Sequence, residues 1–176
     1  LQSSAASDVY KRQILGGVSI PFSKGTVAHS DGDVVIHALC DALLGAAGLG
    51  DIGHFFPDND KKFKNIDSKI LLKEVFEMIH KEGFSIENID LTIVLEAPKL
   101  KNYLPEMKSQ ISKCINLQVS NINIKATTSE KLGFIGRGEG VSCYASTLIK
   151  YWIYNSKVNK NQNYINHFAY IWNNKF

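Results

Sequence analysis

The chain has 176 residues and a net charge of +3, with 44% hydrophobic and 21% charged side chains. This length and balance are typical of one globular domain with a substantial core. The net charge gives no argument for nucleic-acid binding, and no apolar run approaches the roughly 20 residues that a membrane span needs. We therefore expect a soluble single domain that binds neither nucleic acid nor membrane.

The cysteines indicate the redox environment of the protein, and the two chain ends differ in composition from the rest. Cys40, Cys114 and Cys143 are odd in number, far apart and set among apolar residues, which indicates reduced thiols in a reducing compartment. Residues 1–13 are small and polar and lack the apolar core of a signal peptide. We expect a truncated or foreign segment there, with a transit-peptide remnant as the alternative. Residues 155–176 are rich in asparagine and lysine, so we expect a poorly ordered tail or an added terminal helix.

The first elements in chain order are a strand and a helix. Residues 14–21 read as a short strand whose glycine pair indicates a bulge or a close backbone approach. Ser30 and Asp31 precede a long apolar run, and such short acceptors bind the free N–H groups of a helix's first turn. We expect that helix to begin near Asp33, to cover residues 34–49 and to be buried on more than one side.

Three polar residues share one face of this apolar helix. Asp33, His37 and Asp41 are spaced four residues apart. A histidine between two carboxylates suits a metal ligand whose ring a carboxylate orients; a buried ion pair or a satisfied core histidine would give the same spacing. His29 and Ser30 stand at the expected start of the helix, where a histidine and a hydroxyl make a plausible phosphate cradle.

The remaining pattern alternates helices and strands. The predicted elements are an acidic, aromatic loop over residues 51–60, a helix over 68–82, a strand over 89–95, a helix from Pro105, a strand over 119–126, a loop rich in glycine and hydroxyl groups over 127–140, and a strand over 141–149. This order fits an α+β domain, with a mixed β-sheet and helices packed on one face.

Three blocks carry a family resemblance: AHSDGDVVIHALCDALLGAAGLGDIGHFFPD, then EAPK, then IKATTSEKLGFIGRGEG. Together they resemble the 2-C-methyl-D-erythritol 2,4-cyclodiphosphate synthases, over residues 14–150 of a domain that we place at 14–154. The resemblance implies a homotrimer with active sites between subunits. The substrate would be 4-diphosphocytidyl-2-C-methyl-D-erythritol 2-phosphate, cyclised with release of CMP in the non-mevalonate route to isoprenoids.

The resemblance also implies roles for individual residues. His29 and Thr128 would steady the transition state, His37 would bind Zn²⁺, and Glu130 would bind a second ion, Mg²⁺ or Mn²⁺, at the substrate diphosphate. The other positions match substrate-binding residues: Ser30 for phosphate; Asp51 and Gly53 for the methylerythritol hydroxyls; Phe56, Pro57, Asp58, Asn59 and Asp60 in a covering loop; Leu95, Pro98, Lys99, Leu100, Lys101, Ala126, Thr127 and Ser129 on the cytidine side; and Phe134 and Arg137. Arg137 and Glu139 could instead line a trimer axis.

One family motif is missing. The family opens with an Asp-x-His strand that supplies two further zinc ligands, whereas this chain has Asp8-Val9-Tyr10. Because a catalytic zinc normally has three protein ligands, we expect weak zinc binding and slow turnover. The roles of Asp33 and Asp41 stay open: these residues could support His37 or belong to the start of the helix.

The sequence is also compatible with two other functions. A metal-dependent phosphohydrolase would also use histidine, aspartates and a phosphate-binding helix start, but it leaves residues 96–99 unexplained. A non-catalytic module would hold a cytidine nucleotide or an isoprenoid phosphate without turnover. For a synthase we expect the cytoplasm of a bacterium, with a plastid as the alternative.

Overall fold

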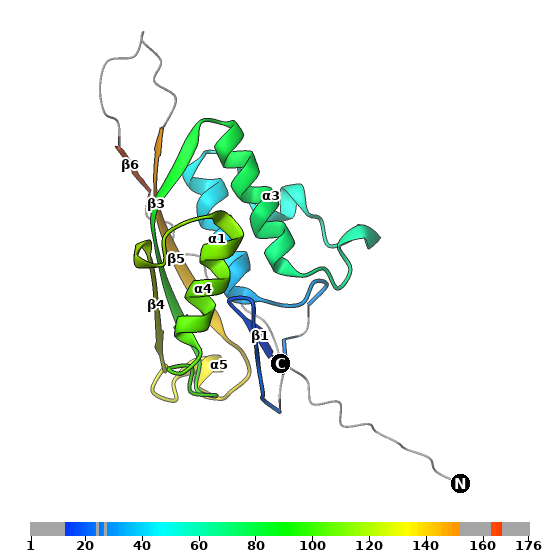
Figure 1. Cartoon of the computed structure of the whole chain (residues 1–176). Coiled ribbons are helices and arrows are strands. Elements are labelled where there is room, and N and C mark those ends of the chain that lie inside the picture. The colour runs from blue at the N-terminus through cyan, green and yellow to red at the C-terminus, as the bar shows by residue number, and fades with distance from the viewer. Residues whose placement is uncertain (1–12, 24, 27, 152–162, 167–176) are drawn as a thin grey trace.

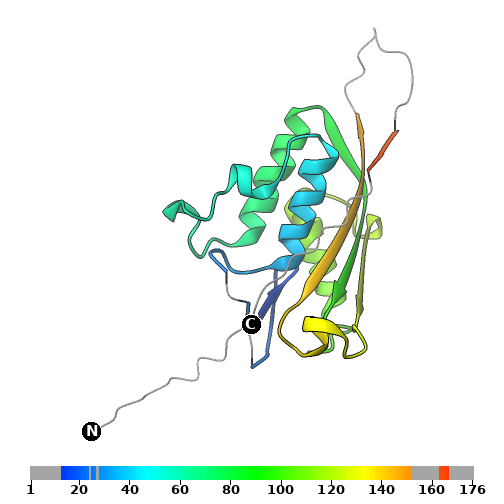
Figure 2. The ribbon, with the colours of Figure 1, turned by 180° about the vertical axis from the view of Figure 1, so that it is seen from behind.

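A computed structural model describes residues 13–23, 25–26, 28–151 and 163–166. Its strands form a small hairpin and one four-stranded sheet in the order β4-β3-β5-β6. Figures 1 and 2 show the helices on one face of that sheet. The elements are β1 (Gln13–Leu15), β2 (Val18–Ile20), α1 (Val34–Ala46), α2 (Ile52–Phe55), α3 (Ser68–Lys81), β3 (Phe84–Val94), α4 (Leu104–Ile115), β4 (Ile122–Thr127), α5 (Gly133–Gly136), β5 (Ser142–Tyr151) and β6 (Asn163–Asn166).

This arrangement confirms the expected α+β class. The sheet is mixed, because β3 pairs parallel with β4 and antiparallel with β5. Helix α1 lies between the sheet and α3 (Figure 2), and every residue of it except Gly45 is buried. The three cysteines are free, as expected. None of the helices in the described residues is long and apolar enough to cross a membrane.

The single strand expected over residues 14–21 is wrong. Two strands form there, β1 and β2, joined by a turn at Gly16 and Gly17 with φ of 59° and 75°. Two consecutive positive φ values are the geometry of a tight hairpin turn, which glycine adopts without strain. The turn also has no room for a side chain at Gly16, because a Cβ there would lie 2.9 Å from the Cβ of Met107. The predicted close backbone approach is therefore confirmed.

Asp33 joins this hairpin to α1. Its carboxylate caps the helix by accepting from the N–H groups of Val35 and Ile36, both at 3.1 Å. The same carboxylate accepts from Gly16 N–H at 2.9 Å and from Gly17 N–H at 2.6 Å. Asp33 is fully buried, so four backbone donors, three of them in buried hydrogen bonds, depend on one side chain.

Several predicted boundaries differ from the structure. The strand expected at 89–95 begins at Phe84, because β5 is long enough to pair with it from that residue on. The loops expected at 51–60 and 127–140 contain the short helices α2 and α5, and residues 119–121 form a 3₁₀ turn before β4. In the asparagine-rich segment, Asn163–Asn166 form β6 along β5 rather than a tail or a helix. The rest of that segment, and residues 1–12, lie outside the described residues.

We expect Asp33→Ala to lower the free energy of unfolding by about 3 kcal/mol or more. The change removes a helix cap and leaves the N–H groups of the glycine turn without an acceptor in a buried place. Asp67→Ala is the matched control, because Asp67 caps α3 through Lys69 N–H at 2.9 Å but its side chain is exposed. We expect about 1 kcal/mol for the control. Urea unfolding measures both, and equal losses would contradict a special role for Asp33.

Candidate functional site

The residues predicted for one half of the site lie at the start of α1, along it, and in the segment that follows it. We call His29, Ser30, His37 and residues 51–60 the helix-side cluster. His29 Nε2 lies 3.1 Å from the carbonyl oxygen of Asp60, and the His29 carbonyl accepts from Asn65 N–H at 2.7 Å. Asp31 N–H donates to the carbonyl of Ile66 at 3.1 Å. The chain that leads into α1 is thus held against the segment between α2 and α3.

His37 belongs to a network that the sequence did not reveal. Its Nε2 lies 3.0 Å from Ser68 Oγ and 3.2 Å from Ser30 Oγ. Ser68 Oγ donates its only proton to the carboxylate of Asp31, so it can only accept from His37 Nε2–H. The Ser30 hydroxyl, facing the same N–H, keeps its own proton for another acceptor. This assignment of protons follows from the network.

Asp31 and Ser68 are functional candidates that the sequence analysis missed. Asp31 was interpreted as a possible helix cap, but the cap is Asp33. Asp31 instead accepts from Ser68 N–H at 2.9 Å and connects α3 to the residues before α1. Ser68 is 31 positions from His37, and no local spacing signals such a contact.

The environment of His37 favours its neutral form. The residue is 8% exposed. Burial lowers the pKa of its imidazole, and the nearby charge of Asp31 acts in the opposite direction. A neutral ring with a fixed Nε2 proton can orient a neighbouring hydroxyl.

Asp41 supports the other edge of the cluster. Its Oδ1 accepts from Ile52 N–H at 2.8 Å, while its buried Oδ2 has no hydrogen-bond partner among the described residues. Burial raises the pKa of this carboxyl to about 6; the Ile52 N–H lowers it and Asp51 raises it. Asp33 is therefore a helix-start residue, and Asp41 positions the start of α2.

The predicted substrate-binding residues of the segment 51–60, which include the covering loop 56–60, have different environments. Asp51 is exposed and caps α2 by accepting from His54 N–H at 3.0 Å. Phe56 is buried edge-to-face against Phe63, with ring centroids 5.4 Å apart. The other members, Gly53, Pro57, Asp58, Asn59 and Asp60, are exposed or half-buried. Phe56 thus anchors a segment whose polar tip is open to solvent.

The other predicted half lies where β3 and β4 end. We call residues 95–101 and 126–137 the strand-end cluster. Because the two strands are parallel, their ends meet at one edge of the sheet: Val94 pairs with Thr127, and Leu95 N–H donates to the Thr127 carbonyl at 3.0 Å. Leu95 and Leu100 are buried in the core, whereas Lys99 and Lys101 are exposed. The leucines anchor the segment, and the lysines remain available to a ligand.

Glu96 organises the hydroxyl-rich loop after β4. Its Oε1 accepts from Ser129 N–H and Ser129 Oγ, both at 3.0 Å, and from Lys131 N–H at 3.2 Å. Partial desolvation raises the pKa of Glu96, but the donors from Ser129 and Lys131 outweigh it, so the pKa lies below its ordinary value. Thr128 Oγ1 donates to Glu130 at 2.6 Å. Sequence reasoning missed Glu96, although it lies within one of the quoted family blocks.

The backbone of this loop is strained. Glu130 and Lys131 have φ of 53° and 63°, a region that residues with a side chain seldom adopt. Gly136 makes the turn sterically possible, because a Cβ there would lie 2.0 Å from the carbonyl carbon of Lys131. Phe134 is half-buried in α5, and Arg137 forms two hydrogen bonds of 2.9 Å with Glu139, which raises the pKa of the guanidinium.

The two clusters lie on different parts of the molecule. In Figures 1 and 2 the segment between α2 and α3 projects away from the sheet, whereas α5 lies at one end of it. Within the described ranges, no three His, Cys, Asp or Glu side chains come close enough to hold a metal ion. His37 alone does not make a zinc site, which needs three protein ligands.

We expect His37 to titrate below the ordinary imidazole value of about 6.5, because burial disfavours its charged form. NMR titration of labelled histidine measures this pKa, with the spectrum of His37→Gln to assign the signal. Asp31→Asn should lower the pKa further, since it removes the charge that favours the imidazolium. A pKa of His37 above 6.5, or an upward shift in Asp31→Asn, would contradict this electrostatic picture.

We expect Glu96→Ala to accelerate amide hydrogen exchange at Ser129 and Lys131 by about fivefold, because a net hydrogen bond contributes about 1 kcal/mol and each of these backbone donors loses its acceptor. Asp90→Ala is the control: Asp90 lies on β3, the strand that precedes Glu96, but its carboxylate bonds the side chains of Asn123 and Lys125 rather than a backbone N–H. Mass spectrometry of exchange locates the effect. Equal acceleration in both variants would contradict the inference that Glu96 holds the loop after β4 in place.

Comparisons with known proteins agree with this layout. Residues 5–150 match the YgbB family. A 2-C-methyl-D-erythritol 2,4-cyclodiphosphate synthase of Haemophilus ducreyi is 54% identical over 136 residues, which are 77% of this chain and 85% of that protein. A solved bifunctional IspDF protein of Campylobacter jejuni has 48% identity and a TM-score of 0.78, over 81% of this chain and 38% of the larger one.

A third comparison includes a nucleotide. The structure of IspF of Plasmodium falciparum, solved as a CDP complex, has 35% identity and a TM-score of 0.71, covering 80% of this chain and 85% of that one. The family match over residues 5–150 spans both clusters. The chain therefore belongs to the YgbB family, the family of the 2-C-methyl-D-erythritol 2,4-cyclodiphosphate synthases.

Proposed function

We propose that the chain is a lyase that converts 4-diphosphocytidyl-2-C-methyl-D-erythritol 2-phosphate into 2-C-methyl-D-erythritol 2,4-cyclodiphosphate and CMP, in isoprenoid biosynthesis. Family membership supports the reaction. The observation that carries the proposal is the Asp31–Ser68–His37–Ser30 network, because it leaves a hydroxyl donor at the predicted phosphate cradle beside His29.

The reaction is an intramolecular phosphoryl transfer. An oxygen of the 2-phosphate forms a bond to the β-phosphorus, and the bond from that phosphorus to the bridging oxygen breaks. The bridging oxygen leaves with CMP, so no water is consumed. Such a reaction depends on positioning and on neutralising the phosphate charges rather than on covalent catalysis.

The helix-side cluster would hold the methylerythritol phosphate. The Ser30 hydroxyl donates to a phosphate oxygen while His37 fixes its orientation. His29 lies beside it, and its Nε2–H donates to the Asp60 carbonyl, so the ring is held near the reacting phosphate. Asp51 would accept from the substrate hydroxyls, and Gly53 lets the backbone approach them. The exposed tip at residues 58–60 would cover the substrate.

The strand-end cluster would hold the cytidine diphosphate. Its exposed ammonium groups, on Lys99 and Lys101, can neutralise phosphate charge. In the structure the Thr128 hydroxyl donates to Glu130. On substrate binding, this hydroxyl would turn to a substrate oxygen instead. The CDP bound by the Plasmodium relative favours a cytidine nucleotide here as well.

We propose that the complete site forms between subunits of a homotrimer. The two clusters carry complementary halves of the chemistry, and they lie on different parts of one chain. A ring of three copies would bring the helix-side cluster of one chain to the strand-end cluster of the next, and such heterologous contacts close into rings. Arg137 and Glu139 remain candidates for the trimer axis.

The described residues fit one of the two predicted metal ions better than the other. Glu130 offers an exposed carboxylate, and one carboxylate together with substrate phosphates is a usual environment for Mg²⁺ or Mn²⁺, which would neutralise the diphosphate charge. The described residues around His37 do not fit Zn²⁺, and no step here is assigned to it. We place the enzyme in the bacterial cytoplasm, by analogy with its bacterial relatives, and its catalytic domain at residues 14–154.

The activity test follows phosphorus resonances while the chain is incubated with the diphosphocytidyl substrate, Zn²⁺ and Mg²⁺. We expect the cyclic diphosphate and CMP to appear together, slowly because the Asp-x-His motif is missing. A second form, in which an Asp-x-His strand replaces residues 1–13, should be faster. Free phosphate would indicate a hydrolase, and binding without turnover in both forms would indicate a non-catalytic module. Either result overturns the proposal.

Mixing two inactive variants tests the shared site. His29→Ala impairs one cluster and Thr128→Val the other, so each variant alone should be inactive. In trimers reassembled from equal amounts, about a quarter of the sites would combine two intact halves, because each half comes from a different chain. We therefore expect about a quarter of the wild-type rate. Sites formed within single chains would give no recovery, and unmixed refolded variants are the control.

A further inference from the structure

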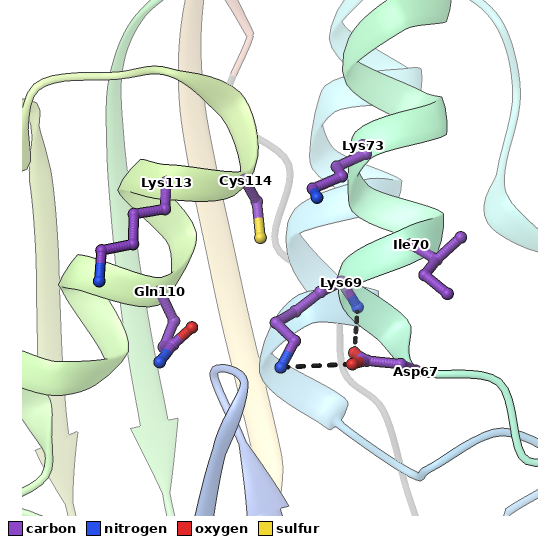
Figure 3. A pocket seen from close by; sticks show the side chains of 7 residues that line it. All are labelled: Asp67, Lys69, Ile70, Lys73, Gln110, Lys113 and Cys114. Carbon is purple, nitrogen blue, oxygen red and sulfur yellow. Dashed lines mark hydrogen bonds and ion pairs between the residues drawn. The ribbon is translucent and has the colours of Figure 1, made fainter.

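A pocket of about 230 Å³ lies between α3 and α4, outside both clusters. Figure 3 shows Lys69 and Lys73 on α3 and, across the gap, Gln110 and Cys114 on α4. The volume is several times the ~30 Å³ that one water molecule occupies, so the pocket can take a ligand of several atoms. Nothing in the proposed reaction uses these residues.

The charge of the pocket is positive and only partly compensated. Asp67 is the one carboxylate that lines it, and its oxygens accept from Lys69 N–H at 2.9 Å and pair with Lys69 Nζ at 3.3 Å. Lys73 and Lys113 form no ion pair with the described residues. Figure 3 shows the Lys73 ammonium group turned toward the gap, whereas the Lys113 side chain extends away from it. Both residues line the pocket, and these flexible side chains can bring positive charge to a bound anion.

The glycine hairpin packs against two of the residues that line the pocket. A Cβ on Gly17 would lie 3.0 Å from Cδ of Lys69 and 3.3 Å from Cβ of Gln110. The turn therefore packs against the stems of both side chains. This contact limits the freedom of Lys69 and Gln110 before any ligand arrives, which lowers the entropy that binding costs.

We propose that this pocket binds a small phosphate anion, either inorganic phosphate or inorganic diphosphate. Its polar lining presents ammonium groups and a carboxamide, whereas its only carboxylate already accepts from Lys69. Ammonium groups bind phosphate as point charges, and the amide N–H adds a directed hydrogen bond. The inference does not depend on the proposed function, because none of its residues belongs to the reaction site.

Cys114 provides a local reporter. It is half-buried and lines the pocket, whereas Cys40 and Cys143 are fully buried. Burial raises the pKa of the Cys114 thiol, while the charges of Lys73 and Lys69 lower it. A bound anion would block the thiol and oppose the lysines. Reaction of this cysteine with a neutral reagent such as dithiodipyridine should therefore be slower when the pocket is occupied.

The experiment measures that rate in the full chain against added phosphate or diphosphate, at constant ionic strength maintained with chloride. At about ten times the dissociation constant, we expect the rate to fall about tenfold, because only the unoccupied fraction reacts. Cys114→Ser should abolish the fast reaction. The protection should vanish in Lys73→Gln/Lys113→Gln and persist in Lys81→Gln/Lys108→Gln, which removes the same charge from the same two helices outside the pocket.

Equilibrium dialysis with radiolabelled phosphate provides a second measurement that does not use the thiol. We expect one more anion bound per chain in the wild type than in Lys73→Gln/Lys113→Gln. Equal binding in both forms, or protection that chloride alone reproduces, would overturn the proposal. Because neither measurement requires turnover, failure here leaves the synthase proposal untouched, and loss of synthase activity leaves this one untouched.

Discussion

The structure depends on the four backbone hydrogen bonds of the Asp33 carboxylate. They join the first turn of α1 to the glycine turn of the β1–β2 hairpin. The glycine turn also contacts Met107 of α4 and Lys69 of α3. A buried carboxylate is costly unless its oxygens are satisfied, and here both oxygens are. One side chain therefore fixes where α1 begins relative to α3 and α4, and His37 follows one turn later.

The position of α1 matters because the helix-side cluster is assembled around it. Asp31 ties the residues before the helix to the start of α3, through Ser68. Asp41, two turns further along the helix from Asp33, accepts from Ile52 N–H and sets the start of α2. Three aspartates with different partners thus place three separate segments relative to α1. Their carboxylates serve the backbone and a serine hydroxyl, and so the sequence spacing alone could not distinguish them from metal ligands.

This explains how far the sequence could predict the site. The start of α1, the helix α3 and most of the strand β3 follow from local periodicity, and each was expected. The roles of Ser68 and Glu96 arise from contacts between residues 31 to 37 positions apart, and no periodic pattern encodes such contacts. The hairpin at Gly16 was read as one strand for a related reason: two three-residue strands are too short to show alternation. The pairing of β6 with β5 is likewise a tertiary contact, in a segment whose composition favours disorder.

The two clusters are held in physically different ways, and this difference fits their separate tasks. Around His37 the supporting groups are buried or half-buried, and the ring itself is 8% exposed. In the strand-end cluster, one half-buried carboxylate, Glu96, holds a loop whose Glu130 and Lys131 are exposed and strained at positive φ. Strain persists only where surrounding contacts fix it, so the loop has few alternatives while Glu96 binds it. A buried cradle and a loop fixed at one point, whose side chains remain open to solvent, fit the proposal that a neighbouring chain completes the site.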